Sequence, residues 1–151
     1  MASCIDASAG NIDFLELISQ AETQYSIPQG LLSAIARIES KMNPHALNIG
    51  GKSILVSSKE EANYIVNTHL KNSVTNIDIG IMQLNYRWHS KHFSSVEEML
   101  DPILNIKYAA QLMSDLYKQH GSWQAAVRHY HSANPKYHKK YSRQIILAWL
   151  S

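Results

Sequence analysis

The chain has 151 residues, of which 45% are hydrophobic and 9% aromatic, enough for one core of ordinary size. Its net charge of +2 is too weak to indicate nucleic-acid binding, although a mildly basic surface suits an anionic polymer. No apolar run is long enough to span a bilayer. We therefore expect a monomer of one domain, with no transmembrane segment and no nucleic-acid partner.

Residues 1–10 are interpreted as the remnant of an export leader or as residues added for expression, and residues 11–151 as the single domain. Cys4 has no second cysteine to pair with. It is therefore either a plain unpaired thiol or a lipid-carrying N-terminus exposed by signal cleavage. Removal of a leader would place the protein in the periplasm or outside the cell.

Two helices are predicted in the first part of the chain. The first spans residues 11–24, where apolar residues recur at three-residue spacing: Ile12, Leu15, Ile18 and Ala21. The second has Pro28 in its first turn and ends near Asn43-Pro44, because a residue before proline is pushed out of helical geometry. Its inward residues are Leu31, Leu32, Ile35 and Ile38. Glu39 then lies near the C-terminal end of this helix, on the side of the apolar stripe.

The middle of the chain is less regular. We expect a loop over residues 45–57 and a helix over 57–70, with Ser57–Glu60 or Ser58–Glu61 as its capping box. The apolar face of that helix is Ala62, Ile65, Val66 and Leu70. The segment 50–76 is either a lid or groove wall, or a helix that covers the core. Residues 77–85 indicate an irregular or short β segment.

The last third reads as a series of helices. They cover residues 95–100, 102–120 after Asp101, and the stretch from Ser122 to a break at 132–135, followed by a last helix around 137–150. Gly121 closes the long one. The inward residues are Ile103, Ile106, Ala110, Met113 and Tyr117, then Trp123, Ala126, Val127 and Tyr130. The predicted fold class is mainly α, with little β structure.

Two carboxyl groups are the first candidates for chemistry. Glu39 should be partly buried, and burial disfavours the carboxylate, so this acid could protonate a leaving oxygen near neutral pH. Asp78 has a polar setting in Asn76, Gln83 and Asn85. Each residue alone is more often structural. As a pair, one acid in an apolar pocket and one ionised in a polar setting suit cleavage of a sugar–sugar bond.

Three motifs in order resemble those of lytic transglycosylases. Residues 34–44, Ala-Ile-Ala-Arg-Ile-Glu-Ser-Lys-Met-Asn-Pro, look like the catalytic Glu-Ser motif. Residues 80–85, Gly-Ile-Met-Gln-Leu-Asn, look like the Gly-Leu-Met-Gln motif, and residues 126–132 look like the Ala-x-x-x-Tyr-Asn motif. The resemblance covers residues 11–150. It implies a lysozyme-like (α+β) core of the goose-type and transglycosylase kind, and an enzyme that cleaves peptidoglycan in the wall.

The resemblance also implies roles for single residues. Glu39 would be the acid, and Ser40 would help to position the active site. Gln83 and Asn85 would contact the sugar, and the Tyr130 hydroxyl would lie near the Glu39 carboxyl.

Two positions depart from the family's motifs. His131 stands where the family usually has asparagine, and this Tyr-His-Ser variant is associated with transglycosylases of secretion and conjugation machines. Asn48 replaces a groove serine nine residues after the glutamate. Both are expected to contact the substrate, and components of such an apparatus are expected partners beside the glycan strands of peptidoglycan.

Two reactions stay open because residues 78–85 also resemble the c-type lysozyme segment that carries a second catalytic carboxylate. In one, Glu39 protonates the glycosidic oxygen and then takes the proton of the muramic acid's own 6-hydroxyl, closing a 1,6-anhydro ring. In the other, Asp78 stabilises or bonds the sugar cation and Glu39 activates water. We favour ring closure, with Asp78 as electrostatic help. A catalytically silent module that binds glycan or an assembly partner is the third alternative.

Other features have simpler explanations. The eight histidines include two short-spaced pairs, His129-x-His131 and His89-x-x-His92, but no cysteine or carboxylate cluster accompanies them, so we expect no metal and no other cofactor. Trp88 follows the Gln83 motif and is a candidate for stacking on a sugar ring. Trp123 and Trp149 are expected in the core.

Overall fold

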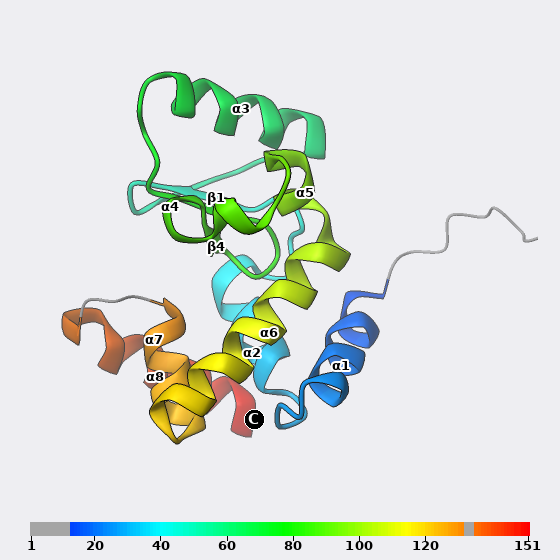
Figure 1. Cartoon of the computed structure of the whole chain (residues 1–151), viewed down its shortest axis with the longest axis vertical. Helices are drawn as coiled ribbons and strands as arrows, with labels where there is room; N and C mark the ends of the chain where they lie inside the picture. The colour runs from blue at the N-terminus through cyan, green and yellow to red at the C-terminus, as the bar shows by residue number, and fades with distance from the viewer. Residues whose placement is uncertain (1–12, 132–134) are drawn as a thin grey trace, which may run out of the picture.

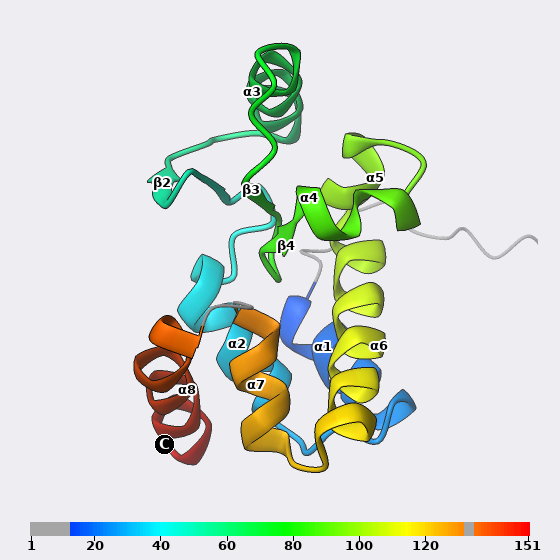
Figure 2. The ribbon, with the colours of Figure 1, turned by 60° about the vertical axis from the view of Figure 1, so that its left-hand side comes forward.

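The computed structural model describes residues 13–131 and 135–151, which form a mainly helical domain with a small antiparallel sheet. Figure 1 shows the sheet and α3 at one end, α1, α2, α7 and α8 at the other, and the long α6 running between them; Figure 2 shows the same from a second side. The helices are α1 (Phe14–Gln24), α2 (Leu31–Ser40), α3 (Lys59–Lys71), α4 (Tyr86–His89), the 3₁₀ turn η1 (Ser90–His92), α5 (Val96–Leu100), α6 (Pro102–His120), α7 (Trp123–His131) and α8 (Pro135–Leu150). The strands are β1 (Leu47–Ile49), β2 (Lys52–Ile54), β3 (Ile77–Ile79) and β4 (Leu84–Asn85).

The first helix is shorter than predicted, and its buried side differs. Ile18 and Ala21 are buried as expected, but Leu15 is 56% exposed, so its place in the apolar stripe was wrong. Ile12 lies outside the described residues. The side chain that completes the buried face is Glu22, which is almost fully buried. The three-residue spacing missed Glu22 because an isolated acid on a helix is ordinarily assigned to the solvent side.

Glu22 explains how the second helix begins. Its two carboxylate oxygens accept hydrogen bonds from the backbone N–H groups of Gly30 (3.1 Å) and Leu32 (2.8 Å) at the start of α2. These N–H groups have no partner within the helix, so Glu22 caps it from a distance. The first turn therefore begins at Leu31, and Pro28 lies in the preceding turn, contrary to the prediction.

The second helix packs as predicted except at one position. Leu31, Leu32 and Ile35 are fully buried, whereas Ile38 is 41% exposed and was wrongly assigned to the core. The helix contacts α1 and α8. It ends at Ser40, because Lys41 adopts the left-handed conformation, with φ of 54°, that terminates helices. Glu39 therefore occupies the last turn, close to the predicted position.

The predicted loop over residues 45–57 contains a hairpin of β1 and β2, so this assignment was wrong in part. Gly50 and Gly51, with φ of 59° and 91°, form the two-residue turn that such a hairpin requires. The short β segment expected over residues 77–85 is confirmed as β3 and β4. The strand order is β2-β1-β3-β4, with every neighbouring pair antiparallel.

The helix α3 covers the core beside the sheet. Its Ala62 and Val66 are buried, Ile65 and Leu70 are partly buried, and the helix packs against α5. Ser58 is the N-cap and accepts from the Glu61 N–H, as in the second of the two predicted capping boxes. Of the two interpretations given for residues 50–76, a helix that covers the core therefore applies to α3.

The helices of the last third start and stop close to the predicted residues. Ser95, Asp101 and Ser122 each accept a hydrogen bond from a backbone N–H in the first turn that follows, and Gly121 ends α6 with φ of 81°. The buried residues include Ile106, Ala110, Met113, Ala126 and Val127. Two predicted core residues, Ile103 and Tyr117, are exposed instead. The predicted break begins at residues 132–134, which lie outside the described part of the chain.

Candidate active site

The carboxyl of Glu39 lies at the C-terminal end of α2, where that helix faces the sheet (Figure 2). Its side chain is only 13% exposed, so the predicted partial burial is confirmed. Oε1 of Glu39 lies 3.1 Å from Nδ1 of His131, the last residue of α7. Two elements that are 92 residues apart in the chain therefore meet at this carboxyl.

The neighbouring Ser40 connects this helix end to the turn between β3 and β4. Its hydroxyl is 2.6 Å from the carbonyl oxygen of Ile81 and 3.0 Å from that of Ala36. A hydroxyl has one hydrogen, so the shorter contact is the main bond. Ser40 is buried by these contacts and therefore holds the site together from within.

The turn that follows β3 depends on a glycine and on a buried asparagine that the motifs did not indicate. Gly80 has φ of 85°, and a Cβ there would come within 2.6 Å of the Asn105 side-chain nitrogen. The Asn105 amide donates to the carbonyls of Ile79 (3.0 Å) and Met99 (2.8 Å) and accepts from the N–H of Met82 (2.9 Å). Asn105 thus holds the back of the turn. Its only sequence signal is an asparagine within the apolar stripe of α6.

Asp78 stands in a row of polar residues across the sheet. It pairs with Asn48 on one side and with Asn85 on the other, which places the three side chains on one face. The Asn85 amide donates to the Asp78 carboxylate (3.0 Å) and to Asn76 (3.0 Å). Of the three residues predicted to give Asp78 a polar setting, Asn85 bonds to it directly and Asn76 bonds to Asn85, whereas the Gln83 amide bonds to backbone carbonyls.

The electrostatics connect Asp78 to the end of α2. Burial raises the pKa of Asp78, the hydrogen bond from Asn85 opposes this rise, and the charge of Glu39 adds to it. His131 acts in the lowering direction. The two carboxyl groups predicted as a pair are therefore close enough to affect each other's charge.

Two tyrosines lie near the Glu39 carboxyl. The Tyr130 hydroxyl donates to the Met82 carbonyl at 2.6 Å, and burial and then the charge of Glu39 raise its pKa well above the ordinary value. Tyr141 of α8 was not among the predicted residues. Its buried hydroxyl lies close enough to Glu39 that burial and this carboxyl raise its pKa well above the ordinary value. The Tyr141 hydroxyl makes no hydrogen bond of ordinary geometry.

Two other residues predicted to contact the sugar, Gln83 and Asn48, form hydrogen bonds with nearby backbone groups. The Gln83 amide nitrogen donates to the carbonyls of Ala46 and Gly80, both at 2.9 Å, so this side chain connects the turn to the start of β1. The Asn48 oxygen accepts from the N–H of Gly51 at 3.0 Å. Asn48 belongs to the polar row that contains Asp78.

The tryptophans divide between surface and core. Trp88 in α4 is 64% exposed, which leaves its ring accessible for stacking. Trp123 and Trp149 are partly buried against the core, as expected, and the Trp149 N–H donates to the carbonyl of Gln29. Trp88 therefore stays a candidate for stacking on a sugar ring.

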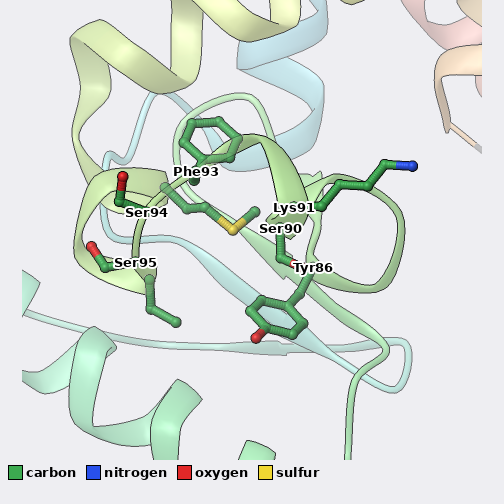
Figure 3. A pocket seen from close by; sticks show the side chains of 8 residues that line it. Tyr86, Ser90, Lys91, Phe93, Ser94 and Ser95 are labelled. Atoms are coloured by element: carbon green, nitrogen blue, oxygen red, sulfur yellow. The ribbon is translucent and has the colours of Figure 1, made fainter.

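A pocket of about 150 Å³ lies beside this region, between α4, η1 and α5. Figure 3 shows Tyr86 and Phe93 in its lining, with the Lys91 ammonium pointing away. Neither Glu39 nor Asp78 lines it. Within residues 13–131 and 135–151, no group of three or more His, Cys, Asp or Glu side chains could hold a metal ion. Among the same residues, no helix has the length and apolar character of a membrane span.

A mainly helical domain with a small antiparallel sheet, and with one carboxyl at a helix end and another on a neighbouring strand, has the architecture of the lysozyme-like class. The chain matches the family described as the transglycosylase SLT domain over residues 16–145. Protein IpgF of Shigella flexneri is 32% identical over 140 residues, covering 87% of this chain and 77% of the relative. Invasion protein IagB of Salmonella typhimurium is 29% identical over 135 residues, covering 83% and 70%.

A further relative is the type IV secretion system protein virB1 of Brucella abortus, which is 26% identical over 133 residues, covering 82% of this chain and 55% of the relative. No solved structure matches the chain significantly. The chain belongs to the transglycosylase SLT domain family and is a peptidoglycan lytic transglycosylase. The resemblance to lytic transglycosylases predicted from the three motifs is confirmed.

Proposed function

We propose that Glu39 is the catalytic acid and base of this enzyme, and that it cleaves the β-1,4 bond between N-acetylmuramic acid and N-acetylglucosamine. The observation that carries the proposal is the position of its carboxyl. It is largely shielded from water, lies at a helix end, and is close enough to Asp78, Tyr130 and Tyr141 to raise the pKa of each of them. A shielded carboxyl beside a polar strand can exchange a proton with a sugar oxygen.

In the proposed reaction, the Glu39 proton passes to the bridging oxygen and the bond from that oxygen to C1 of the muramic acid breaks. The 6-hydroxyl of the same sugar then attacks C1, and its proton returns to Glu39. The products are a free 4-hydroxyl on the leaving sugar and a 1,6-anhydro ring. No water is consumed, and the carboxyl ends in its starting state.

Asp78 would stabilise the positive charge that develops at C1 in this reaction. It lies on the same sheet face as Asn48 and Asn85, and the hydrogen bond from Asn85 favours its charged form. Ser40, Gln83 and Tyr130 would position the site or contact the sugar. Hydrolysis is the second candidate, because an acid in the position of Asp78 also suits a lysozyme mechanism.

We further propose that the enzyme is a periplasmic or exported monomer that opens the wall for a secretion or conjugation apparatus. Support comes from the names of two relatives, an invasion protein and a type IV secretion system protein.

The test combines clearing of purified cell walls with mass spectrometry of the released muropeptides. An anhydro end lacks one water relative to a reducing end, so the two reactions differ in product mass. Glu39→Gln should abolish clearing while the melting temperature stays near that of the wild type. Asp78→Asn should slow formation of anhydro products. If the wild-type enzyme released muropeptides with reducing ends, the reaction would be hydrolysis and not ring closure. Substantial clearing by Glu39→Gln would exclude Glu39 as the acid.

A further inference from the structure

His131 lies within hydrogen-bond distance of the Glu39 carboxyl, although it was expected to contact the substrate. Its Nδ1 is 3.1 Å from Oε1 of Glu39, and the imidazole is 37% exposed. His131 is the last residue of α7, so its position relative to α2 depends on how these two helices are held.

The His131 imidazole also packs against an aromatic ring. Its ring stacks on the ring of Tyr141, with centroids 3.7 Å apart and an angle of 15° between the planes. Tyr141 is buried in α8, which packs against both α2 and α7. The contact with Glu39 and the stack on Tyr141 together restrict the imidazole, so it can in turn restrict the carboxyl.

We propose that His131 is a positioning residue for Glu39: its Nδ1–H holds Oε1, and Oε2 then carries the proton that is delivered to the sugar. This inference rests on the proposed role of Glu39. In the acid form, Oε1 is the carbonyl oxygen and accepts an ordinary hydrogen bond. When the proton leaves Oε2, Oε1 acquires negative charge and the same bond becomes charge-assisted. The interaction strengthens as the reaction proceeds, which is the condition for faster catalysis.

A histidine at this position has one property that the family's usual asparagine lacks. An asparagine amide could hold Oε1 in the same way, but it cannot bind a further proton. An imidazolium beside Oε1 favours the carboxylate of Glu39, and a carboxylate cannot protonate the glycosidic oxygen. In such a pair the protons belong to both groups. An imidazolium at position 131 would therefore hold part of the Glu39 population ionised, which an asparagine cannot do.

Other groups that face this pair come from three elements: Asp78 of β3, Tyr130 of α7 and Tyr141 of α8. The raised pKa values of the two tyrosines keep their hydroxyls neutral at the pH of an assay. Asp78 is common to every variant compared below. A difference in pH profile between variants at position 131 can therefore be assigned to the imidazole.

The experiment compares His131→Asn and His131→Ala with the wild type on a soluble glycan oligomer, with kcat and KM measured from pH 5 to pH 8. His131→Ala should lower kcat about tenfold, the value of one hydrogen bond to a charged group, and leave KM within about twofold. His131→Asn should restore kcat to within about threefold at pH 7.5. Between pH 7 and pH 5, its rate should rise more steeply than that of the wild type.

The matched control is His129→Asn, which replaces another imidazole of α7, one that stacks on His120 instead. It should reproduce the wild-type pH profile. Equal losses in His131→Asn and His131→Ala, a change confined to KM, or superimposable profiles of wild type and His131→Asn would each overturn the proposal. If Glu39→Gln still cleared walls, the proposed function itself would fail. If Glu39→Gln were inactive while the variants at position 131 behaved like the wild type, only this inference would fail.

Discussion

The Ser40 hydroxyl donates a 2.6 Å hydrogen bond to the backbone carbonyl of Ile81. Ser40 directly follows Glu39, and Ile81 lies in the turn that directly follows the strand of Asp78. One buried bond therefore sets the distance between the helix end and the strand that carry the two carboxyls. The Glu-Ser motif and the Gly-x-Met-Gln motif are physically connected through it.

Replacing Ser40 by alanine should disturb activity more than stability. The loss of one buried hydrogen bond should lower the free energy of unfolding by about 1 kcal/mol. The end of α2 and the turn after β3 would no longer be held at a fixed distance, so kcat should fall roughly tenfold. Thermal unfolding and wall clearing measure the two effects. Ser33→Ala is the control, because it removes a hydroxyl from the other end of α2, bonded to Gly30; an equal loss of kcat in both variants would contradict the prediction.

Elements with their own start and stop residues could be predicted closely from the sequence. Asp101 and Gly121 frame α6 because a cap and a left-handed glycine act on residues within one turn of themselves. The hairpin of β1 and β2 was missed because each strand has three residues, too few for an alternating pattern to stand out. Exposed apolar residues such as Leu15 were misplaced because spacing does not determine which neighbour a helix face will meet.

The residues of the candidate site also fall into those that the sequence could predict and those that it could not. Motifs indicated Glu39 and Asp78, and the structure brings them together. Asn105 and Tyr141 could not be predicted, because their roles depend on partners far away in the chain: Asn105 bonds to Met82 across 23 residues, and Tyr141 approaches Glu39 from another helix. A local pattern contains no information on such pairs.

Asn105→Ala should be strongly destabilising. It would leave the Met82 N–H and the carbonyls of Ile79 and Met99 without partners in a buried site, at about 3 kcal/mol or more in total. Asn105→Asp keeps the shape but turns an oxygen toward the two carbonyls, and should also lower the melting temperature. Lys107→Ala on the exposed side of α6 should change stability by less than about 0.5 kcal/mol. Equal melting temperatures for Asn105→Ala and Lys107→Ala would show that the amide does not hold the turn.

Glu22→Ala tests whether a buried carboxylate maintains the start of α2. The N–H groups of Gly30 and Leu32 would lose their acceptor, and we expect a loss of about 2 to 4 kcal/mol in the free energy of unfolding. Chemical denaturation gives this value directly. The control is Glu16→Ala, which removes an exposed acid from α1, the helix that carries Glu22. It should lower the free energy of unfolding much less. A similar midpoint for both variants would mean that the cap contributes little.

His89 lies in α4, next to the exposed Trp88. Burial first, and then the charges of His92 and Lys91, lower the pKa of His89 to about 4, and its Nδ1 is 2.8 Å from the Tyr108 hydroxyl. A histidine in the unfolded chain gains its proton near pH 6.5, whereas the native one stays neutral until near pH 4. Between these values the unfolded state binds more protons. The stability that His89 contributes is therefore complete above pH 6.5 and is lost as the pH falls through this range.

The free energy of unfolding should thus fall by about 1 to 2 kcal/mol between pH 6.5 and pH 4.5 from this group, because solvent screens part of the effect on a side chain that is only partly buried. His89→Gln cannot gain a proton, so its stability should decline less over the same interval. His69→Gln is the control, since the His69 ring lies in the separate helix α3, where its Nδ1–H donates to the Ile65 carbonyl. Denaturation curves at both pH values measure each difference. If His89→Gln lost as much stability on acidification as the wild type does, the acid sensitivity of the fold would have to come from other groups than the His89 imidazole.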